Sequence, residues 1–325
     1  MKILYAVQAT GNGHISRAME LLPHLSQKGE VDIFLSGSNS TLAIDAPVKF
    51  RSQGLSLFYK CDGGLDYWKM TRAYSPLRLK KEINELPVEK YDLVLNDFDH
   101  ITSAACAKKG VPSVNFGHQA SFVSEKTPRP SIKSRIGEWI LLNYARATRQ
   151  AGLHFERYDE FIFTPVIKQM ILDAQPTDGG YVTVYLPAYC EPQLKSLFNK
   201  LPDFRFEIFS RETKSDRTEG HITWKPVNKQ LFNESLIHCT GIITGGGFET
   251  PAEALHLGKK ILSIPIRGQY EQQCNAAALR KMGITTLERL DELFPEEFYN
   301  WIYCKKALKK DYSRSVPDLL HHVFG

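Results

Sequence analysis

Long apolar stretches are missing from this 325-residue chain. No uninterrupted run reaches the roughly 18 apolar residues of a membrane-spanning helix. The amino terminus, MKILYAVQATGNGH, becomes polar after a short apolar run, so it does not have the apolar region of a secretory signal peptide. These absences favour a cytoplasmic protein.

Cysteine and net charge are also limited. The six cysteines form no C-x-x-C pair, so we expect reduced thiols and no cysteine-based metal site. The net charge of +5 suits a phosphorylated ligand or an anionic membrane surface but is too small to indicate nucleic-acid binding. The cysteines are Cys61, Cys106, Cys190, Cys239, Cys274 and Cys304.

Two common phosphate-binding motifs are absent as well. No G-x-x-x-x-G-K-[ST] run occurs, which excludes a P-loop. The turn GNGHIS lacks the third glycine of the dinucleotide fingerprint, and the following strand ends in LSGSNS without an acidic residue for a ribose. A dehydrogenase that uses NAD is therefore a distant alternative.

The chain does contain short apolar strand patterns that alternate with helical patterns. This alternation predicts parallel strands joined by crossover helices, and it occurs in both halves of the sequence. We therefore expect an α/β protein of two doubly wound, Rossmann-like domains, residues 1–165 and 166–301. Strands are expected at 2–7, 31–37, 91–97, 111–117, 181–188, 204–210 and 260–266, whereas HITWKPVN is expected to be a loop.

The stretch GIITGGGFETPAEAL joins a strand to a helix through Gly245, Gly246 and Gly247. Glycines allow a ligand to approach the backbone, and the helix amino terminus offers unpaired N–H groups and partial positive charge. A diphosphate fits such a corner. The alternative is a tight turn that only needs glycine conformations.

Residues 244–276, TGGGFETPAEALHLGKKILSIPIRGQYEQQCNA, resemble the nucleotide-binding signature of GT-B glycosyltransferases. The similarity is to the branch of the bacterial lipid II UDP-N-acetylglucosamine transferase and the UDP-glucuronosyltransferases. GNGHISRA and VNFGHQASF resemble amino-terminal loops of that branch. The resemblance implies two facing domains, a carboxy-terminal helix within about 302–325 that returns to the first domain, and transfer of a hexosyl group from a nucleotide sugar, with UDP expected, to a lipid-linked or saccharide hydroxyl.

The resemblance also implies donor-binding residues. Glu253 matches the glutamate that binds the ribose hydroxyls, and the backbone around Val227, between Pro226 and Asn228, matches the loop that binds uracil, although thymidine and guanosine remain open. Gly245 stands where retaining members have a second glutamate, which favours inversion. The remaining positions are Phe248 in the glycine turn and Glu271, Gln272 and Gln273, which precede Asn275 and match the sugar-binding pair.

His14 follows the first glycine turn, formed by Gly11, Asn12 and Gly13. A neutral imidazole suits removal of a proton from an acceptor hydroxyl, and the helix amino terminus should keep the ring neutral. The alternatives for His14 are that it contacts the diphosphate or the acceptor, or that it caps the helix. Asp97 is expected to orient His14, and Asp99 is the alternative residue for that role. His118 is the second candidate base, and Gln119 is expected to face the acceptor.

Neither a metal nor a cofactor is expected. Asp97-Phe98-Asp99 has the form of an Asp-x-Asp metal motif but lies far in sequence from the diphosphate turn. Residues 126–149 carry six basic residues interleaved with apolar ones, so they predict either a helix in peripheral contact with the inner membrane face or a core-facing helix with a solvated basic side. A sugar-nucleotide epimerase and a non-catalytic nucleotide-sugar binder remain as alternative functions.

Overall fold

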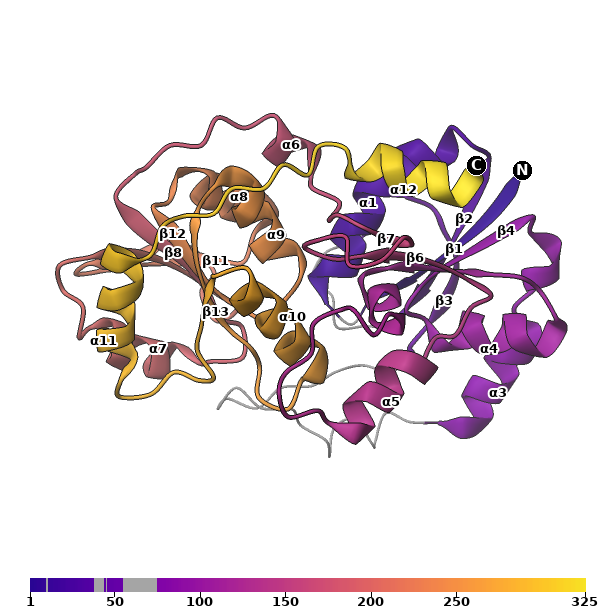
Figure 1. The fold of residues 1–325 in the computed structure, drawn as a ribbon, viewed down its shortest axis with the longest axis horizontal. Coiled ribbons are helices and arrows are strands. Elements are labelled where there is room, and N and C mark those ends of the chain that lie inside the picture. The colour runs from indigo at the N-terminus through magenta and orange to yellow at the C-terminus, as the bar shows by residue number, and fades with distance from the viewer. Residues whose placement is uncertain (10, 38–43, 45, 55–74) are drawn as a thin grey trace.

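Two α/β halves lie side by side in a computed structural model that describes residues 1–9, 11–37, 44, 46–54 and 75–325 (Figure 1). Each half contains a seven-stranded sheet. All strand pairs are parallel except β10 with β11. This arrangement matches the GT-B architecture expected from the sequence.

The amino-terminal sheet has the order β3-β2-β1-β4-β5-β6-β7. Its central strand β1 is almost completely buried, as a continuous apolar run in a parallel sheet predicts. The strands are β1 (Lys2–Gln8), β2 (Glu30–Ser36), β3 (Val48–Ser52), β4 (Leu93–Asp97), β5 (Val114–Gly117), β6 (Arg149–Leu153) and β7 (Ile162–Phe163). The helices of this half are α1 (Asn12–Ser26), α3 (Pro76–Glu85), α4 (His100–Lys109) and α5 (Arg135–Asn143), with short η1 (Val88–Lys90) and η2 (His118–Val123).

The carboxy-terminal sheet has the order β10-β11-β9-β8-β12-β13-β14. Its strands are β8 (Tyr181–Tyr185), β9 (Arg205–Ser210), β10 (Arg217–Glu219), β11 (Ile222–Pro226), β12 (Gly241–Gly245), β13 (Lys260–Ile264) and β14 (Thr285–Thr286). Its helices are α6 (Gln169–Leu172), α7 (Glu191–Phe198), α8 (Lys229–His238), α9 (Glu249–Leu257), α10 (Tyr270–Lys281) and α11 (Phe294–Tyr299), followed by the π-helical turn η3 (Asn300–Cys304).

Two segments differ from the sequence prediction. HITWKPVN is not a loop, because residues Ile222–Pro226 form β11 with Ile222 and Trp224 buried on one face. The basic stretch 126–149 contains a helix only over Arg135–Asn143, and β6 begins at Arg149. Prolines at 128 and 130 precede this helix and disfavour an earlier start, because proline restricts the residue before it to extended conformations.

Two segments connect the halves. The first sheet ends at Phe163 and the second begins at Tyr181, so the boundary expected near residue 165 falls between them. Trp301, the last residue expected in the second half, and Ile302, the first expected in the returning helix, both belong to the core of the second half. The final helix α12 (Ser315–Phe324) then lies on the first half beside α1 (Figure 1).

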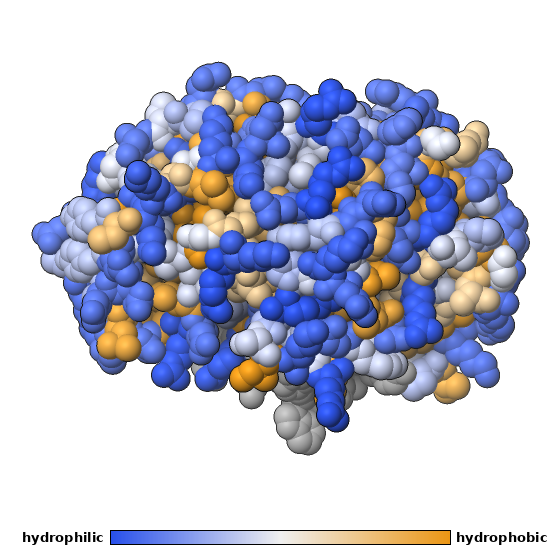
Figure 2. Space-filling model, viewed as in Figure 1, coloured by the Kyte–Doolittle hydropathy of each residue, from blue (hydrophilic) through white to orange (hydrophobic). Residues whose placement is uncertain are grey.

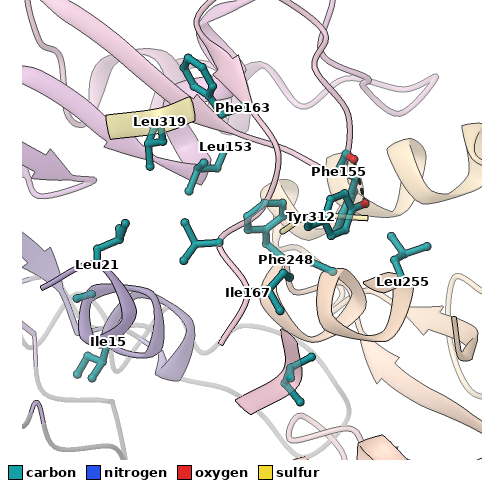
Figure 3. Packing of buried hydrophobic residues seen from close by; sticks show 14 of the residues in the cluster. Ile15, Leu21, Leu153, Phe155, Phe163, Ile167, Phe248, Leu255, Tyr312 and Leu319 are labelled. Atoms are coloured by element: carbon teal, nitrogen blue, oxygen red, sulfur yellow. Dashed lines mark hydrogen bonds between the residues drawn. The ribbon is translucent and has the colours of Figure 1, made fainter. Parts of the chain in front are cut away.

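An apolar core continues from one half into the other (Figure 3). Phe248 from the second half packs near Phe155 and Ile167 of the first half and the linker. Tyr312 of the return segment donates a hydrogen bond from its hydroxyl to the carbonyl oxygen of Phe155, 3.0 Å away. Both connections between the halves are therefore anchored in buried apolar contacts.

The outer surface contrasts with this core. The face in Figure 2 is mostly hydrophilic, with its hydrophobic residues in small separate groups. None of the helices formed by the described residues combines the length and the apolar character needed to cross a membrane.

The expectation of reduced thiols is wrong at Cys190. Cys190 is disulfide-bonded, whereas Cys106, Cys239, Cys274 and Cys304 are free. Cys61 lies outside the described residues. Sequence spacing cannot show which cysteines the fold brings together, and the absence of a C-x-x-C pair excludes only local pairing.

Candidate functional site

The carboxyl ends of β1, β4 and β5 bring the amino-terminal candidates together. The parallel register sets Asp97, at the end of β4, beside Val7 of β1. The turn that leads into α1 therefore lies next to Asp97, as expected for loops at this edge of a doubly wound sheet. Gly117, at the end of β5, approaches the same carboxylate so closely that a Cβ there would lie 2.5 Å from Oδ1 of Asp97.

Asp97 is the centre of a buried charged cluster. Its Oδ1 lies 2.9 Å from Nδ1 of His14, and Nε and Nη2 of Arg17 donate to its carboxylate at 2.8–3.2 Å. The carboxyl side chain has no exposed surface. Burial alone would raise the pKa of Asp97, but the charges and hydrogen bonds of Arg17 and His14 outweigh it and lower the pKa. Asp97 is therefore an ionised partner for His14.

His14 presents its second nitrogen to the space between the halves. A carboxylate only accepts hydrogen bonds, so the contact with Asp97 favours a proton on Nδ1 and a lone pair on Nε2, whereas Nη2 of Arg17, 3.0 Å from the same Nδ1, favours the opposite tautomer. Nε2 lies 3.5 Å from Nε2 of Gln119. Burial alone would lower the pKa of His14, yet Asp97 outweighs burial and raises it. Asp97 thus acts against the neutral ring that the helix amino terminus is expected to favour.

Asp99 does not take part in this cluster. Its carboxylate accepts a hydrogen bond from the backbone N–H of Thr102 at 2.6 Å and caps α4. Phe98 between the two aspartates has a φ of 58°, in the left-handed region, which directs Asp97 and Asp99 to different partners. Among the described residues, no three or more His, Cys, Asp or Glu side chains are grouped so that they could hold a metal ion.

His118 is enclosed by both halves. Its Nδ1 lies 2.9 Å from the carbonyl oxygen of Leu153, and its Nε2 lies 2.8 Å from Oδ1 of Asn275. The ring stacks on Phe248 with 3.9 Å between centroids. Burial lowers its pKa, outweighing the charge of Glu271. Because protein atoms occupy both nitrogens, His118 is less accessible to a substrate hydroxyl than His14.

Gln119 joins the two halves beside His14. Its Nε2 donates to Oε2 of Glu271 at 3.0 Å, in addition to facing His14. Its Oε1 is buried and has no hydrogen-bond partner among the described residues. The acceptor-side candidate and a sugar-binding candidate are thus in direct contact.

The glycine turn after β12 is held from behind by α10. Oε1 of Gln272 accepts hydrogen bonds from the backbone N–H groups of Gly246 and Ile266, at 3.1 and 2.9 Å. Nδ2 of Asn275 donates to the carbonyl oxygen of Gly246 at 3.0 Å. Gln272 therefore fixes the turn rather than pointing its amide oxygen at a sugar, while Gln273 is partly exposed nearby.

The three glycines of this turn have different surroundings. A Cβ at Gly246 would lie 2.7 Å from the carbonyl oxygen of Gln272. At Gly247 no described atom lies within 4 Å of that position, and at Gly245 the nearest is 3.6 Å away. Close packing therefore requires glycine only at 246, and Gly247 faces open space in which a ligand could lie.

Two donor candidates point into the protein. Phe248 is buried against His118 and Phe155, so it joins the halves. Both carboxylate oxygens of Glu253 lie 3.0–3.1 Å from Nζ of Lys168, which also donates to Asn233 at 3.0 Å. Burial raises the pKa of Glu253 despite the nearby lysine charge. No sequence pattern indicated Lys168, which lies in the linker between β7 and α6.

The predicted base-binding loop is shorter than expected, because Pro226 belongs to β11. Val227 is partly exposed. Asn228 caps α8 by accepting hydrogen bonds from the N–H groups of Gln230 and Leu231, at 2.9 and 3.1 Å. Of the three residues of the predicted loop, Val227 is therefore the one whose backbone could contact the nucleotide base.

Sequence reasoning also missed an ion pair between the halves. Nη1 of Arg17 contacts Oε1 of Glu249, and a Cβ at Gly13 would collide with the same carboxylate. Gly11 lies in open space, with no described atom within 4 Å of a Cβ placed there. A sequence signal existed, because Arg17 lies one helical turn after His14 and Glu249 follows GGGF directly.

Comparison with known proteins agrees with this geometry. Residues 148–304 match the family model described as Glycosyl transferase family 1. Residues 148–304 thus resemble the sequence family of glycosyl transferases. No curated protein sequence matches it.

Solved structures resemble the enzyme over nearly its whole length. Phytolacca americana UGT2 in complex with UDP-2fluoro-glucose and pterostilbene has a TM-score of 0.60 and 13% identity, covering 98% of this chain and 93% of that one. Arabidopsis thaliana UGT89C1 with UDP has 0.58 and 13%, covering 99% and 93%. SsfS6 from Streptomyces sp. SF2575 with thymidine diphosphate has 0.56 and 15%, covering 99% and 94%. These similarities establish the fold.

The glycine turn generates a matched pair of predictions. Gly246→Ala should destabilise the enzyme by about 1–3 kcal/mol, because the new Cβ must displace the backbone at Gln272. Gly247→Ala should leave stability nearly unchanged, because its Cβ enters open space. Urea unfolding of both variants measures the difference. Equal losses of stability in the two variants would contradict this description of the turn.

Proposed function

We propose that this glycosyltransferase moves a hexosyl group from a nucleoside diphosphate sugar, with UDP the expected nucleotide, to an acceptor hydroxyl, with inversion and without a metal. The observation that carries the proposal is the position of His14. Its Nε2 lies 3.5 Å from the amide nitrogen of Gln119, which donates to Glu271. Glu271 belongs to α10, the helix that also holds the glycine turn. A base and a corner suited to diphosphate thus share one junction.

The donor side of the proposal rests on the turn at Gly245–Gly247. Gln272 and Asn275 fix the turn, and the amino terminus of α9 follows it. Fixed N–H groups and the helix field can stabilise a departing diphosphate without reorganisation. UDP and thymidine diphosphate are bound by two of the similar structures, and we extend this class of ligand to the present chain. Glu253 would bind the ribose in exchange for one of its contacts with Lys168.

The acceptor side rests on the pair His14–Asp97. In direct displacement, Nε2 takes the proton of the attacking hydroxyl, and ionised Asp97 stabilises the imidazolium that forms. The buried, unpartnered Oε1 of Gln119 can accept a hydrogen bond from the same hydroxyl or its neighbour. Inversion is supported by Gly245, which stands at the position where the resemblance implies a glutamate in retaining relatives.

A ligand screen tests the donor assignment. Thermal shift is measured with UDP, thymidine diphosphate, GDP and their glucose and N-acetylglucosamine conjugates. At least one nucleotide should raise the melting temperature, because ligand binding to the folded state stabilises it by mass action. Product analysis then separates the alternatives, since an epimerase converts the sugar nucleotide without an acceptor and a non-catalytic binder leaves it intact. No shift with any of these ligands would refute the proposal.

The pKa of His14 gives a prediction about pH. The base form is lost as pH falls through this pKa, so kcat/KM should fall with an acid-limb midpoint above the ordinary value of about 6.5. Asp97→Asn should move the midpoint to lower pH, because it removes the charge that raises the pKa. His14→Ala should reduce kcat by about 10²–10⁴-fold with little change in nucleotide affinity. Rates are measured as release of nucleoside diphosphate.

The control for this prediction is His24→Ala, because His24 is exposed near the end of the same helix. It should leave both rate and pH profile unchanged. A rate for His14→Ala close to that of His24→Ala would eliminate the base role.

We also propose peripheral contact with an anionic membrane through α5. Gly137 and Glu138 of this helix face Tyr270 of α10, whose hydroxyl donates to Glu138 at 2.6 Å. The apolar side chains on the other side are exposed, with Ile136 at 74% and Trp139 at 64%. The core-facing alternative therefore does not hold for these side chains. Arg135 at the start of the helix and Ile132 and Lys133 in the segment before it are also exposed.

Vesicle co-sedimentation tests this contact. The enzyme should bind phosphatidylglycerol vesicles at low salt and not pure phosphatidylcholine vesicles, because basic and apolar groups act together on an anionic surface. The double variant Ile136→Ser, Trp139→Ser should lose most binding. Tyr303→Ser, at an equally exposed aromatic (71%) of the other half, should retain it. Absence of binding at low salt would end the membrane proposal.

A further inference from the structure

Glu249 occupies the position at which the proposed function requires the donor diphosphate. It is the first residue of α9, directly behind the glycine turn, where the helix amino terminus favours an anion. The preceding residue, Phe248, contributes no side-chain hydrogen bond to cap the helix. The carboxylate of Glu249 therefore supplies negative charge where the proposed function needs a diphosphate.

The contacts of Glu249 cross from one half to the other. Its Oε1 pairs with Nη1 of Arg17, and its Oε2 lies against Gly13 in the first turn of α1. The side chain of Arg17 is 2% exposed and that of Glu249 is 21% exposed. The ion pair thus closes the junction between the two glycine turns from the inside, while Glu249 retains access to solvent.

Asp97 holds Arg17 in a fixed orientation. Nε and Nη2 of Arg17 donate to Asp97, which leaves Nη1 directed across the junction toward α9. A guanidinium held in this way can exchange one anion for another without moving, because its remaining N–H groups keep their direction. Phosphate oxygens are suitable acceptors for such a group.

The charges at the junction disfavour the presence of a diphosphate beside the carboxylate of Glu249. Arg17 contacts two carboxylates, those of Asp97 and Glu249. A diphosphate in the glycine turn adds further negative charge beside Glu249, in a partly buried place where charges interact more strongly than in water. The diphosphate and the carboxylate of Glu249 in its present position therefore exclude each other.

We propose that Glu249 is a placeholder for the donor diphosphate and that Arg17 is a phosphate ligand supplied by the amino-terminal half. In the empty enzyme Glu249 pairs with Arg17. Donor binding displaces Glu249 toward solvent, and Nη1 of Arg17 then donates to a phosphate oxygen. This inference rests on the proposed function. It also couples donor binding to the base, since Arg17 and His14 share Asp97.

Isothermal titration with UDP, thymidine diphosphate, GDP and the corresponding nucleosides tests the exchange. Glu249→Gln keeps the size of the side chain but removes its charge. We expect the variant to bind the preferred diphosphate about tenfold more tightly than the wild type, because the ligand no longer replaces an ion pair or meets a like charge. Affinity for the corresponding nucleoside should not change, since it has no phosphate.

Glu138→Gln is the matched control. Glu138 is another carboxylate between the halves, bonded to Tyr270 and Arg129, with a side-chain exposure of 23%. It lies on the α5–α10 contact and should leave the ratio of diphosphate to nucleoside affinity unchanged. Arg17→Lys, checked for an unchanged melting temperature, should lower that ratio because lysine cannot bind Asp97 and a phosphate with the same fork.

The outcomes separate this inference from the proposed function. If the diphosphates bind but Glu249→Gln does not change their affinity, or improves nucleoside binding equally, the placeholder role is refuted and the proposed function stands. If none of UDP, thymidine diphosphate and GDP binds the wild type or the variant, the proposed donor class fails and the placeholder role fails with it.

Discussion

The charged cluster of the amino-terminal half depends on one buried carboxylate. Asp97 has no exposed side-chain surface, so its charge must be matched by protein groups, because an unpaired buried charge is far more costly than a paired one. Arg17 and His14 provide the match from a single turn of α1. One parallel strand pair and one helix therefore fix the position of the imidazole beside Asp97, which raises its pKa.

The junction between the halves is made of the same groups that the proposed reaction uses. Phe248 stacks on His118, Asn275 contacts His118, and Gln119 contacts Glu271. Any opening of the halves must separate these pairs, and a bound donor must reform or replace them. The geometry of the glycine turn and the geometry of the amino-terminal loops are therefore mechanically linked, even though they lie more than 100 residues apart in the sequence.

The sequence predicted where the motifs lie better than where their side chains point. Alternating strand and helix patterns set the loops of both halves at the carboxyl ends of strands, and the structure has two such sheets. Side-chain direction depends on tertiary contacts, which explains why Gln272 supports the turn from behind and why Phe248 enters the core. The strand β11 was missed because its period-two burial extends over only five residues, one of them proline.

The pKa of His14 illustrates a different limit. A helix amino terminus disfavours a positive charge, but this effect is spread over the backbone and typically contributes 0.3–1 kcal/mol at an exposed site. Asp97 makes a direct contact at 2.9 Å and acts in the opposite direction, because its charge and hydrogen bond raise the pKa of His14. The contact joins residues 83 positions apart, so no local pattern in the sequence could have ranked the two effects.

Glu249 and the proposed diphosphate would both place negative charge at the amino terminus of α9, so they are expected to occupy this position in turn. In the empty enzyme, Glu249 provides the negative charge that the helix amino terminus and Arg17 both favour. With a donor bound, the diphosphate would serve the same two groups. Binding then exchanges one satisfied arrangement for another, so its net free energy is smaller than the new contacts alone would give. In the proposed reaction, the net free energy of binding the product diphosphate would be reduced in the same way. Glu249, by returning to Arg17, would then favour release of the product from this corner.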